Sequence, residues 1–259
     1  MIVVGLPVSG VRVCLRQPAG AEDLMLAEAD CPSPELALAL LERLTQAADG
    51  SHLEVSALSL TDLDVLLVRL RAWLLGDWVR ADADCPDPAC AAPADLSLRL
   101  SEYLRYHEPR VPRGVERSER AGWYRATSLN LEFRVPTVLD VLLLKRSKIS
   151  AHELLLRCLA AEAVPLAARG RLERLMQALA PNLYNQLTAH CPECGKPFSI
   201  YFDPQRFVLQ ELMARALSCY EEIHLLASTY HWSEAQILEL PHTRRARYAS
   251  LAAEGRAQS

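Results

Sequence analysis

The sequence predicts an α+β fold that is mainly helical, with short β-hairpins at the N-terminus and around two cysteine knuckles. Leu, Ala, Arg and Glu are abundant while only 10 of the 259 residues are glycine, and this composition favours helix. Hydrophobic residues make up 51% and charged residues 23%, which provides enough apolar material for a folded core. Short runs that alternate apolar and polar residues indicate strands near the N-terminus and beside two cysteine pairs.

The N-terminal region is expected to begin with two strands. Residues 2–6 and 11–16 flank a turn over 7–10, and the second run alternates as a half-buried strand does. A short helix over 23–28 follows.

The next two helices carry clear signals at their ends. Ser33 is a suitable N-cap and Pro34 suits the first helical position, so a helix begins there. A further helix over 61–75 has apolar residues at helical spacing and ends at Gly76.

The first cysteine pair lies between two expected strands, over 80–84 and 96–100. Residues 107–130 are rich in Pro, Arg and Glu, and we expect them to form an exposed loop. A helical region is then predicted from about 133 to 180, with a break near Pro165.

The second cysteine pair repeats this plan. Strands are expected over 187–190 and 198–202, and Asp203 then caps a helix whose apolar stripe continues to Tyr230. Both knuckles therefore have the order strand, cysteine turn, strand, helix, which indicates a weak internal duplication.

The C-terminal segment is predicted to contain two further helices. Ser233 and Gln236 form a capping box, and Pro241 ends the helix that it starts. The final helix, about 243–253, carries three arginines that we interpret as a solvated face or a protein contact: Arg244, Arg245 and Arg247.

These elements suggest a division of the chain into three parts. The expected parts are 1–106 with the N-terminal hairpin, helices and first knuckle, 107–130 as the exposed loop, and 131–259 as the helical region with the second knuckle. A metal ion shared by the two knuckles would join the first and last parts into one unit.

The candidate metal ligands are the four cysteines of the knuckles. They are Cys85 and Cys90 in Cys-Pro-Asp-Pro-Ala-Cys, and Cys191 and Cys194 in Cys-Pro-Glu-Cys-Gly. Two thiolates separated by two residues in a tight turn can chelate one ion, and Gly195 relieves the backbone. The first pair has a wider spacing. We expect all four thiolates to bind one structural zinc ion.

Two other interpretations of the knuckles stay open. The thiols could be buried in metal-free turns, or the second pair could be a redox Cys-x-x-Cys, although no thioredoxin-like context surrounds it. His190 could replace one cysteine, but it is better interpreted as a neighbour of the site.

The cysteine usage points to a reducing compartment. The chain has eight cysteines, while its N-terminus lacks the basic region and cleavage motif of a signal peptide. Its apolar runs are too short to cross a membrane. We therefore expect a cytoplasmic protein with no membrane partner.

No pattern of catalytic residues is apparent. The sequence lacks a glycine-rich phosphate loop and a Gly-x-Ser-x-Gly elbow, and His152-Glu153 lacks the second histidine of a zinc protease helix. We expect no catalytic residues, no cofactor other than zinc and no small-molecule substrate. The net charge of −4 gives no general reason to expect nucleic-acid binding.

Several segments carry a combined pattern: 11–22, Gly76-Asp77, 103–110, the second knuckle ahead of its Asp203-started helix, 222–227, 230–241 and 244–248. Together they resemble a known family, the small baseplate and tail-assembly proteins of contractile phage tails of the T-even type and of related extracellular contractile injection systems. The first knuckle departs from the pattern, in which Cys-Pro-x-x-Cys or Cys-Pro-x-Cys-Gly is more usual.

The resemblance implies a non-enzymatic role in forming or assembling a baseplate. Its implied partners are other baseplate, hub or tail proteins, and its implied place is an assembled tail particle. A zinc-ribbon regulator that binds nucleic acid is the alternative, suggested by the knuckles and the C-terminal arginines. A hydrolase or redox enzyme ranks last, because no nucleophile and base occur in a recognisable pattern.

Overall fold

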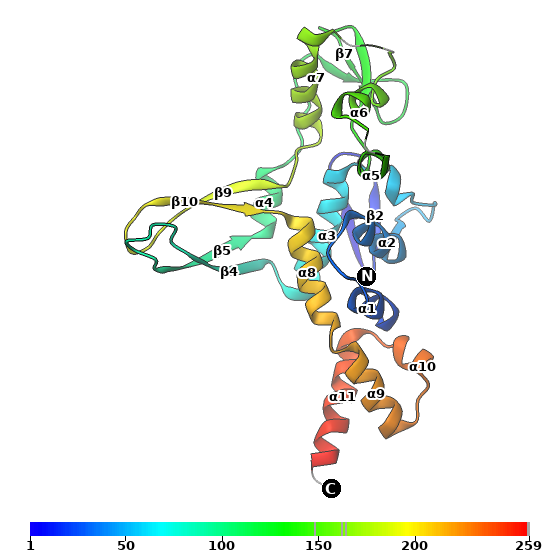
Figure 1. Cartoon of the computed structure of the whole chain (residues 1–259). Helices are drawn as coiled ribbons and strands as arrows, with labels where there is room; N and C mark the ends of the chain where they lie inside the picture. The colour runs from blue at the N-terminus through cyan, green and yellow to red at the C-terminus, as the bar shows by residue number, and fades with distance from the viewer. Residues whose placement is uncertain (148, 162, 164, 258–259) are drawn as a thin grey trace. The chain divides into compact units, whose positions relative to one another are not determined.

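The computed structural model describes residues 1–147, 149–161, 163 and 165–257. It has the predicted mixed α+β fold that is mainly helical (Figure 1). The strands are β1 (Ile2–Gly5), β2 (Arg12–Leu15), β3 (Thr45–Ala47), β4 (Trp78–Asp84), β5 (Pro93–Arg99), β6 (Val115–Arg117), β7 (Trp123–Ala126), β8 (Leu131–Arg134), β9 (Asn185–His190) and β10 (Pro197–Phe202). The helices are α1 (Gly20–Ala27), α2 (Pro34–Leu44), the 3₁₀ turn η1 (Val55–Ala57), α3 (Leu60–Leu75), α4 (Leu100–Tyr106), α5 (Val138–Ser147), α6 (Ala151–Arg157), α7 (Leu166–Leu179), α8 (Pro204–Ala216), α9 (Cys219–Tyr230), α10 (Glu234–Leu238) and α11 (His242–Ala257).

The strands form small sheets. Their orders are β1-β2-β3, β4-β5, β6-β7-β8 and β9-β10. The two-stranded sheets β4-β5 and β9-β10 are antiparallel hairpins that carry the cysteine knuckles at their turns.

The chain divides into two compact units. Unit 1 contains residues 1–3, 13–53 and 205–259, and unit 2 contains residues 4–12 and 54–204. Both cysteine knuckles belong to unit 2. The predicted boundaries at 107 and 131 stay a prediction.

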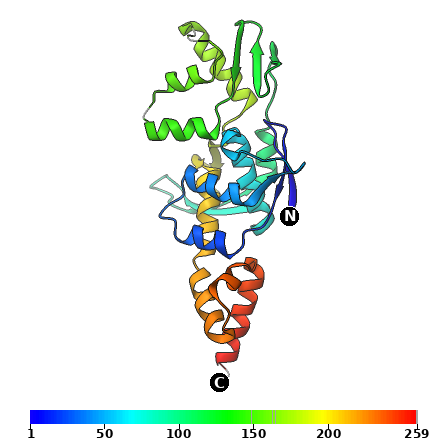
Figure 2. The same cartoon turned by 90° about the vertical axis from the view of Figure 1, so that its right-hand side faces the viewer.

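Unit 1 is built mainly from helices. Ser33 caps α2 as predicted, with its side chain accepting a hydrogen bond from the backbone N–H of Leu36 at 3.1 Å. Helix α2 buries Leu40, Leu41 and Leu44. Helices α9 and α11 lie side by side near the C-terminus (Figures 1 and 2).

The expected continuous helix from Asp203 to Tyr230 is wrong, because α8 ends at Ala216 and α9 begins at Cys219. At the break the hydroxyl of Ser218 donates to the carboxylate of Glu222 at 2.9 Å. Glu222 also accepts a hydrogen bond from the Nε of Arg245 at 2.6 Å, so polar contacts accompany a break through which the apolar spacing continues.

Unit 2 is organised around α3, which is buried on nearly every side. Leu63, Leu66 and Leu70 have no exposed surface. Ser59 accepts a hydrogen bond from the N–H of Asp62 at the start of the helix, and Gly76 ends it with a φ of 92°. The predicted end at Gly76 is therefore confirmed.

The segment 107–130, expected as an exposed loop, contains strands β6 and β7. These pair with β8 in a sheet that packs on α6 and α7 around Phe133. The inward residues alternate with charged ones on the other face, where Arg125 and Glu132 form a cross-strand ion pair of 2.7 Å. The abundance of charge and proline in this segment conceals a short alternation typical of strands.

Within the described part of the chain, no helix is both long and apolar enough to cross a membrane.

Candidate metal centre

The two hairpins of unit 2 close their turns in the same way. Hairpin β4-β5 pairs from Trp78↔Arg99 to Asp84↔Pro93 and hairpin β9-β10 from Asn185↔Phe202 to His190↔Pro197. Beyond the last pair, the N–H of Cys85 donates to the carbonyl of Ala92 at 2.9 Å, and the N–H of Cys191 donates to that of Lys196 at 3.0 Å. The predicted strand, cysteine turn, strand order is confirmed at both knuckles, and Figure 1 shows the two hairpins extending in the same direction.

The tight part of each turn has the same hydrogen bond. The N–H of Gly195 donates to the carbonyl of Cys191 at 2.9 Å, and the N–H of Ala91 donates to that of Asp87 at 2.9 Å. Asp87 thus stands where the second knuckle has its first cysteine.

The wider spacing of the first pair follows from this correspondence. Cys90 matches Cys194, while Cys85 lies two residues before the tight turn and supplies the other sulfur. Ala91 and Gly195, the residues after the second cysteines, both have a left-handed backbone, with φ of 44° and 70°.

The structure brings the four knuckle cysteines together. Their sulfur atoms all lie within 4.8 Å of one another, close enough to hold a metal ion. The Cys85 and Cys194 sulfurs are 3.7 Å apart, and those of Cys90 and Cys191 are 3.8 Å apart. In a tetrahedral site with zinc–sulfur bonds of about 2.3 Å, neighbouring sulfurs lie about 3.8 Å apart, which these two distances match.

The centre is sheltered on one side. Cys85 and Cys191 are buried in a small apolar cluster with Ala94 and Phe198. Cys90 is half-buried, and Cys194 is exposed. Two sulfurs therefore belong to the packing between the hairpins, and one is open to water.

The thiols differ in how readily they ionise. A hydrogen bond from the backbone N–H of Cys194 lowers the pKa of Cys191 to about 7. Although the backbone N–H of Asp87 favours its thiolate, burial and the adjacent thiols of Cys191 and Cys194 raise the pKa of Cys85 to about 12. The pKa of Cys90 is also raised, since burial and the same neighbours outweigh its hydrogen bond from Ala92. A bound cation would offset this repulsion between thiolates.

An ion pair links the two turns next to the sulfurs. The ammonium of Lys196 contacts the carboxylate of Asp87, and this hydrogen bond holds the pKa of Asp87 below its usual value. The pair therefore links the two turns through groups other than the thiols.

The predicted neighbour of the site, His190, lies outside the group of four sulfurs. His190 is exposed and does not belong to the cluster. Among the described residues, the four knuckle cysteines form the one group of possible metal ligands.

The C-terminal arginines do not form one exposed group. Arg244 and Arg247 are exposed, but Arg245 has no exposed surface. Within unit 1, its Nη2 lies 2.6 Å from Asp23 and its Nε lies 2.6 Å from Glu222. The interpretation of Arg245 as part of a solvated face is therefore wrong. One signal in the sequence could have indicated its burial. Arg245 lies seven residues before Ala252, which places both on the same face of α11, and Ala252 is buried.

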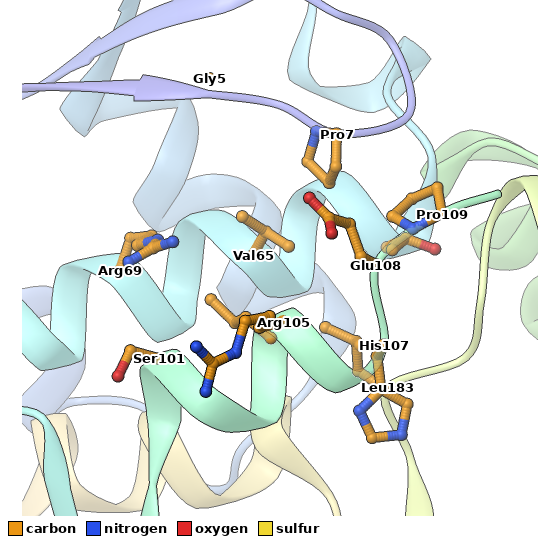
Figure 3. Close-up of a pocket in the computed structure, with 12 residues that line it drawn as sticks. Gly5, Pro7, Val65, Arg69, Ser101, Arg105, His107, Glu108, Pro109 and Leu183 are labelled. Atoms are coloured by element: carbon orange, nitrogen blue, oxygen red, sulfur yellow. The ribbon is translucent and has the colours of Figure 1, made fainter.

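Unit 2 also contains a cavity of about 200 Å³ between α3 and α4 (Figure 3). Its polar groups include Arg69, Arg105 and His107. Nδ1 of His107 lies 2.9 Å from the carbonyl of Tyr103, and Nε2 lies 3.0 Å from the side-chain nitrogen of Asn185. Both ring nitrogens of His107 thus contact other groups of the protein around α4.

Comparison with known protein families, curated proteins and solved structures gives no match to this chain. The chemistry of the four thiols therefore carries the functional inference.

Proposed function

We propose that the protein is a non-enzymatic structural or assembly protein of a contractile tail or injection-system baseplate, fastened by a zinc ion. The observation that carries the zinc assignment is the approach of the four knuckle sulfurs to within 4.8 Å of one another. Four thiolates are a typical ligand set of structural zinc, and such a site leaves no open position for a substrate.

The zinc ion acts as a staple within unit 2. It holds together two hairpins whose facing cysteines, Cys85 and Cys194, are 109 residues apart in the chain. Structural zinc contributes directly to the free energy of folding, because the unfolded chain has no preformed site. The staple therefore makes the paired hairpins a rigid element.

The baseplate assignment is supported by the resemblance in sequence. Its expected partners are other baseplate, hub or tail proteins, with no small-molecule substrate. In unit 1, the half-exposed rings of Tyr230, Trp232 and Tyr248 pack on one another at centroid distances of 5.0 to 6.2 Å. Aromatic groups of this kind often anchor protein interfaces.

Metal analysis tests the staple. The full chain, purified with reductant and zinc, is expected to contain one zinc ion per molecule by elemental mass spectrometry. The double variant Cys191→Ser/Cys194→Ser should lose it, while Cys31→Ser, an exposed cysteine outside the cluster, should keep it. A wild-type chain without stoichiometric zinc would contradict the proposal.

Affinity purification of the tagged chain from its native host tests the assembly role. We expect tail-tube, sheath, spike or wedge proteins to copurify, and the double cysteine variant to recover less of them. Copurification of nucleic acid, with binding that weakens steeply as salt rises, would instead favour the zinc-ribbon regulator.

A further inference from the structure

The shortest sulfur–sulfur distances cross from one knuckle to the other. Cys85 faces Cys194 at 3.7 Å, and Cys90 faces Cys191 at 3.8 Å. A disulfide bond is about 2.0 Å long, so each pair would have to close by about 1.7 Å. Small side-chain rotations supply movements of that size once no ion holds the sulfurs apart.

We propose that the centre is also an oxidation site, at which hydrogen peroxide displaces zinc and forms two disulfides between the hairpins, Cys85–Cys194 and Cys90–Cys191. This inference rests on the proposed zinc centre for its reduced state. The oxidised state depends only on the placement of the thiols.

The burial of the sulfurs suits this pairing. In each facing pair, one sulfur is buried and the other more accessible: exposed Cys194 faces buried Cys85, and half-buried Cys90 faces buried Cys191. Peroxide can reach the accessible sulfur of each pair, and the buried partner lies next to it.

Groups other than the metal hold the turns in place while the bonds form. The Asp87–Lys196 ion pair connects the two turns. The apolar cluster around Ala94 and Phe198 packs the two hairpins together just behind the sulfurs. These contacts do not involve the metal, and they favour the facing arrangement in the conformations from which the disulfides form.

The chemistry balances for each disulfide. The accessible thiolate attacks one oxygen of hydrogen peroxide, which breaks the O–O bond, forms a sulfenic acid and releases hydroxide. The facing thiolate then attacks that sulfur, forming the S–S bond and releasing a second hydroxide. Two protons convert the hydroxides to water. Two peroxides are reduced in all, four thiolates become two disulfides, and the zinc ion leaves without changing its oxidation state.

The pairing decides what oxidation does to unit 2. Disulfides between the knuckles close loops of 109 and 101 residues in sequence separation, so they keep the hairpins joined and restrict the unfolded chain. Disulfides within each knuckle would leave the hairpins unconnected. The cross pairing makes the centre a fastening that works in both reducing and oxidising surroundings.

Tryptic mapping separates the two pairings. Residues 81–99 form one peptide with both cysteines of the first knuckle, and residues 175–206 form another with both of the second, because Lys196 is followed by proline. After peroxide treatment of the zinc-loaded full chain, we expect the two peptides to be joined without reductant and separate with it. Fragmentation of the joined species should assign the Cys85–Cys194 and Cys90–Cys191 bonds.

Parallel measurements follow the metal and the thiols. A chromogenic chelator should record release of one zinc ion per chain, and titratable thiols should fall from eight to four. Cys194→Ser should retain only the Cys90–Cys191 bond, and Cys31→Ser should behave as the wild type.

Separate peptides with internal disulfides, stable sulfinic acids, or bonds between chains would overturn the proposal. A chain that binds no zinc yet forms the cross disulfides would contradict the proposed zinc centre and uphold this inference. A chain that binds zinc but forms disulfides within each knuckle would uphold the proposed zinc centre and contradict this inference.

Discussion

Arg245 is the largest fully buried side chain among the residues that the structure describes. It bridges Asp23 and Glu222, both also buried, at 2.6 Å each. Burial raises the pKa of Asp23, but hydrogen bonds from His242 and Arg245 outweigh it and leave that pKa below its usual value. The arginine thus compensates two carboxylates that have left water.

Replacing Arg245 should be far more costly than replacing its exposed neighbour. Arg245→Ala leaves two buried carboxylates without their cation, and we expect the free energy of unfolding to fall by about 3–5 kcal/mol. Arg247→Ala on the same helix should change it by less than about 0.5 kcal/mol. Urea unfolding measures both, and equal effects would contradict the buried cluster.

Asp64 shows the opposite electrostatic situation in unit 2. It is buried on α3, and its Oδ1 lacks a hydrogen-bond partner among the described residues. Burial, with a smaller effect of the nearby Asp203, raises the pKa of Asp64 well above its usual value. Between the unfolded and folded pKa values the folded state binds the extra proton, so this group makes stability fall as pH rises through that range.

Asp64→Asn is therefore expected to stabilise the protein at pH 7 and to remove this part of the pH dependence. Below about pH 4 the carboxyl is largely protonated in both states, and the variant and wild type should converge. Thermal unfolding followed from pH 4 to 8 measures the difference. A variant less stable than the wild type at pH 7 would show that the carboxylate is compensated in the fold.

At the scale of elements, the two knuckles offer a matched pair of backbone positions. Ala91 has a φ of 44° where the second knuckle places Gly195 with a φ of 70°. A residue with a Cβ in this region is strained by about 1–2 kcal/mol, whereas glycine is not.

Substitutions at these two positions should affect zinc binding differently. We expect Gly195→Ala to weaken zinc binding about tenfold, and Ala91→Gly to leave it unchanged or to strengthen it severalfold. A Cβ at position 195 meets no other atom within 4 Å, so any loss comes from backbone strain alone. Competition with a chelator of known affinity measures both variants. Equal affinities would mean that the turns relax without cost.

Elements were predictable where the residues that define them are neighbours in the sequence, and were not predictable where those residues are distant. Ser33 and Ser233 were predictable caps because the capping group is local in sequence, and the structure confirms both. Strands β6 and β7 were not predicted, since each has only three or four residues and their partners are needed to reveal the inward face. The break at Ser218 was not predicted either, since the apolar spacing continues through it, and the arginine that contacts Glu222 beside it, Arg245, lies 23 residues further along the chain.

The candidate metal site was predictable to the same extent, because only its signals that are local in sequence could be recognised. Ligand spacing predicted which four cysteines would gather. Spacing could not predict that Asp87 occupies the place of a cysteine in the first turn, because that correspondence depends on hydrogen bonds of Cys191 and Ala91. Nor could it predict which sulfurs would face one another.

At the scale of the whole molecule, the proposed zinc site predicts which elements lose local stability when the zinc ion is removed. In unit 2 the cluster at the sulfurs has four buried residues, two of which are Cys85 and Cys191, whereas ten residues of α3 are buried. The hairpins should therefore depend on the metal more than α3 does, since local stability follows the apolar contacts that each element makes.

Hydrogen exchange of the zinc-loaded chain, before and after chelation under reductant, measures this difference. We expect amides of β4, β5, β9 and β10 to lose at least tenfold protection, and those of α3 to change much less. The double variant Cys191→Ser/Cys194→Ser should already show the unprotected pattern without chelator, and Cys31→Ser should respond as the wild type. Uniform loss of protection across unit 2 would mean that the zinc ion supports the whole unit, while no change in the hairpins would mean that packing and the Asp87–Lys196 ion pair alone hold them together.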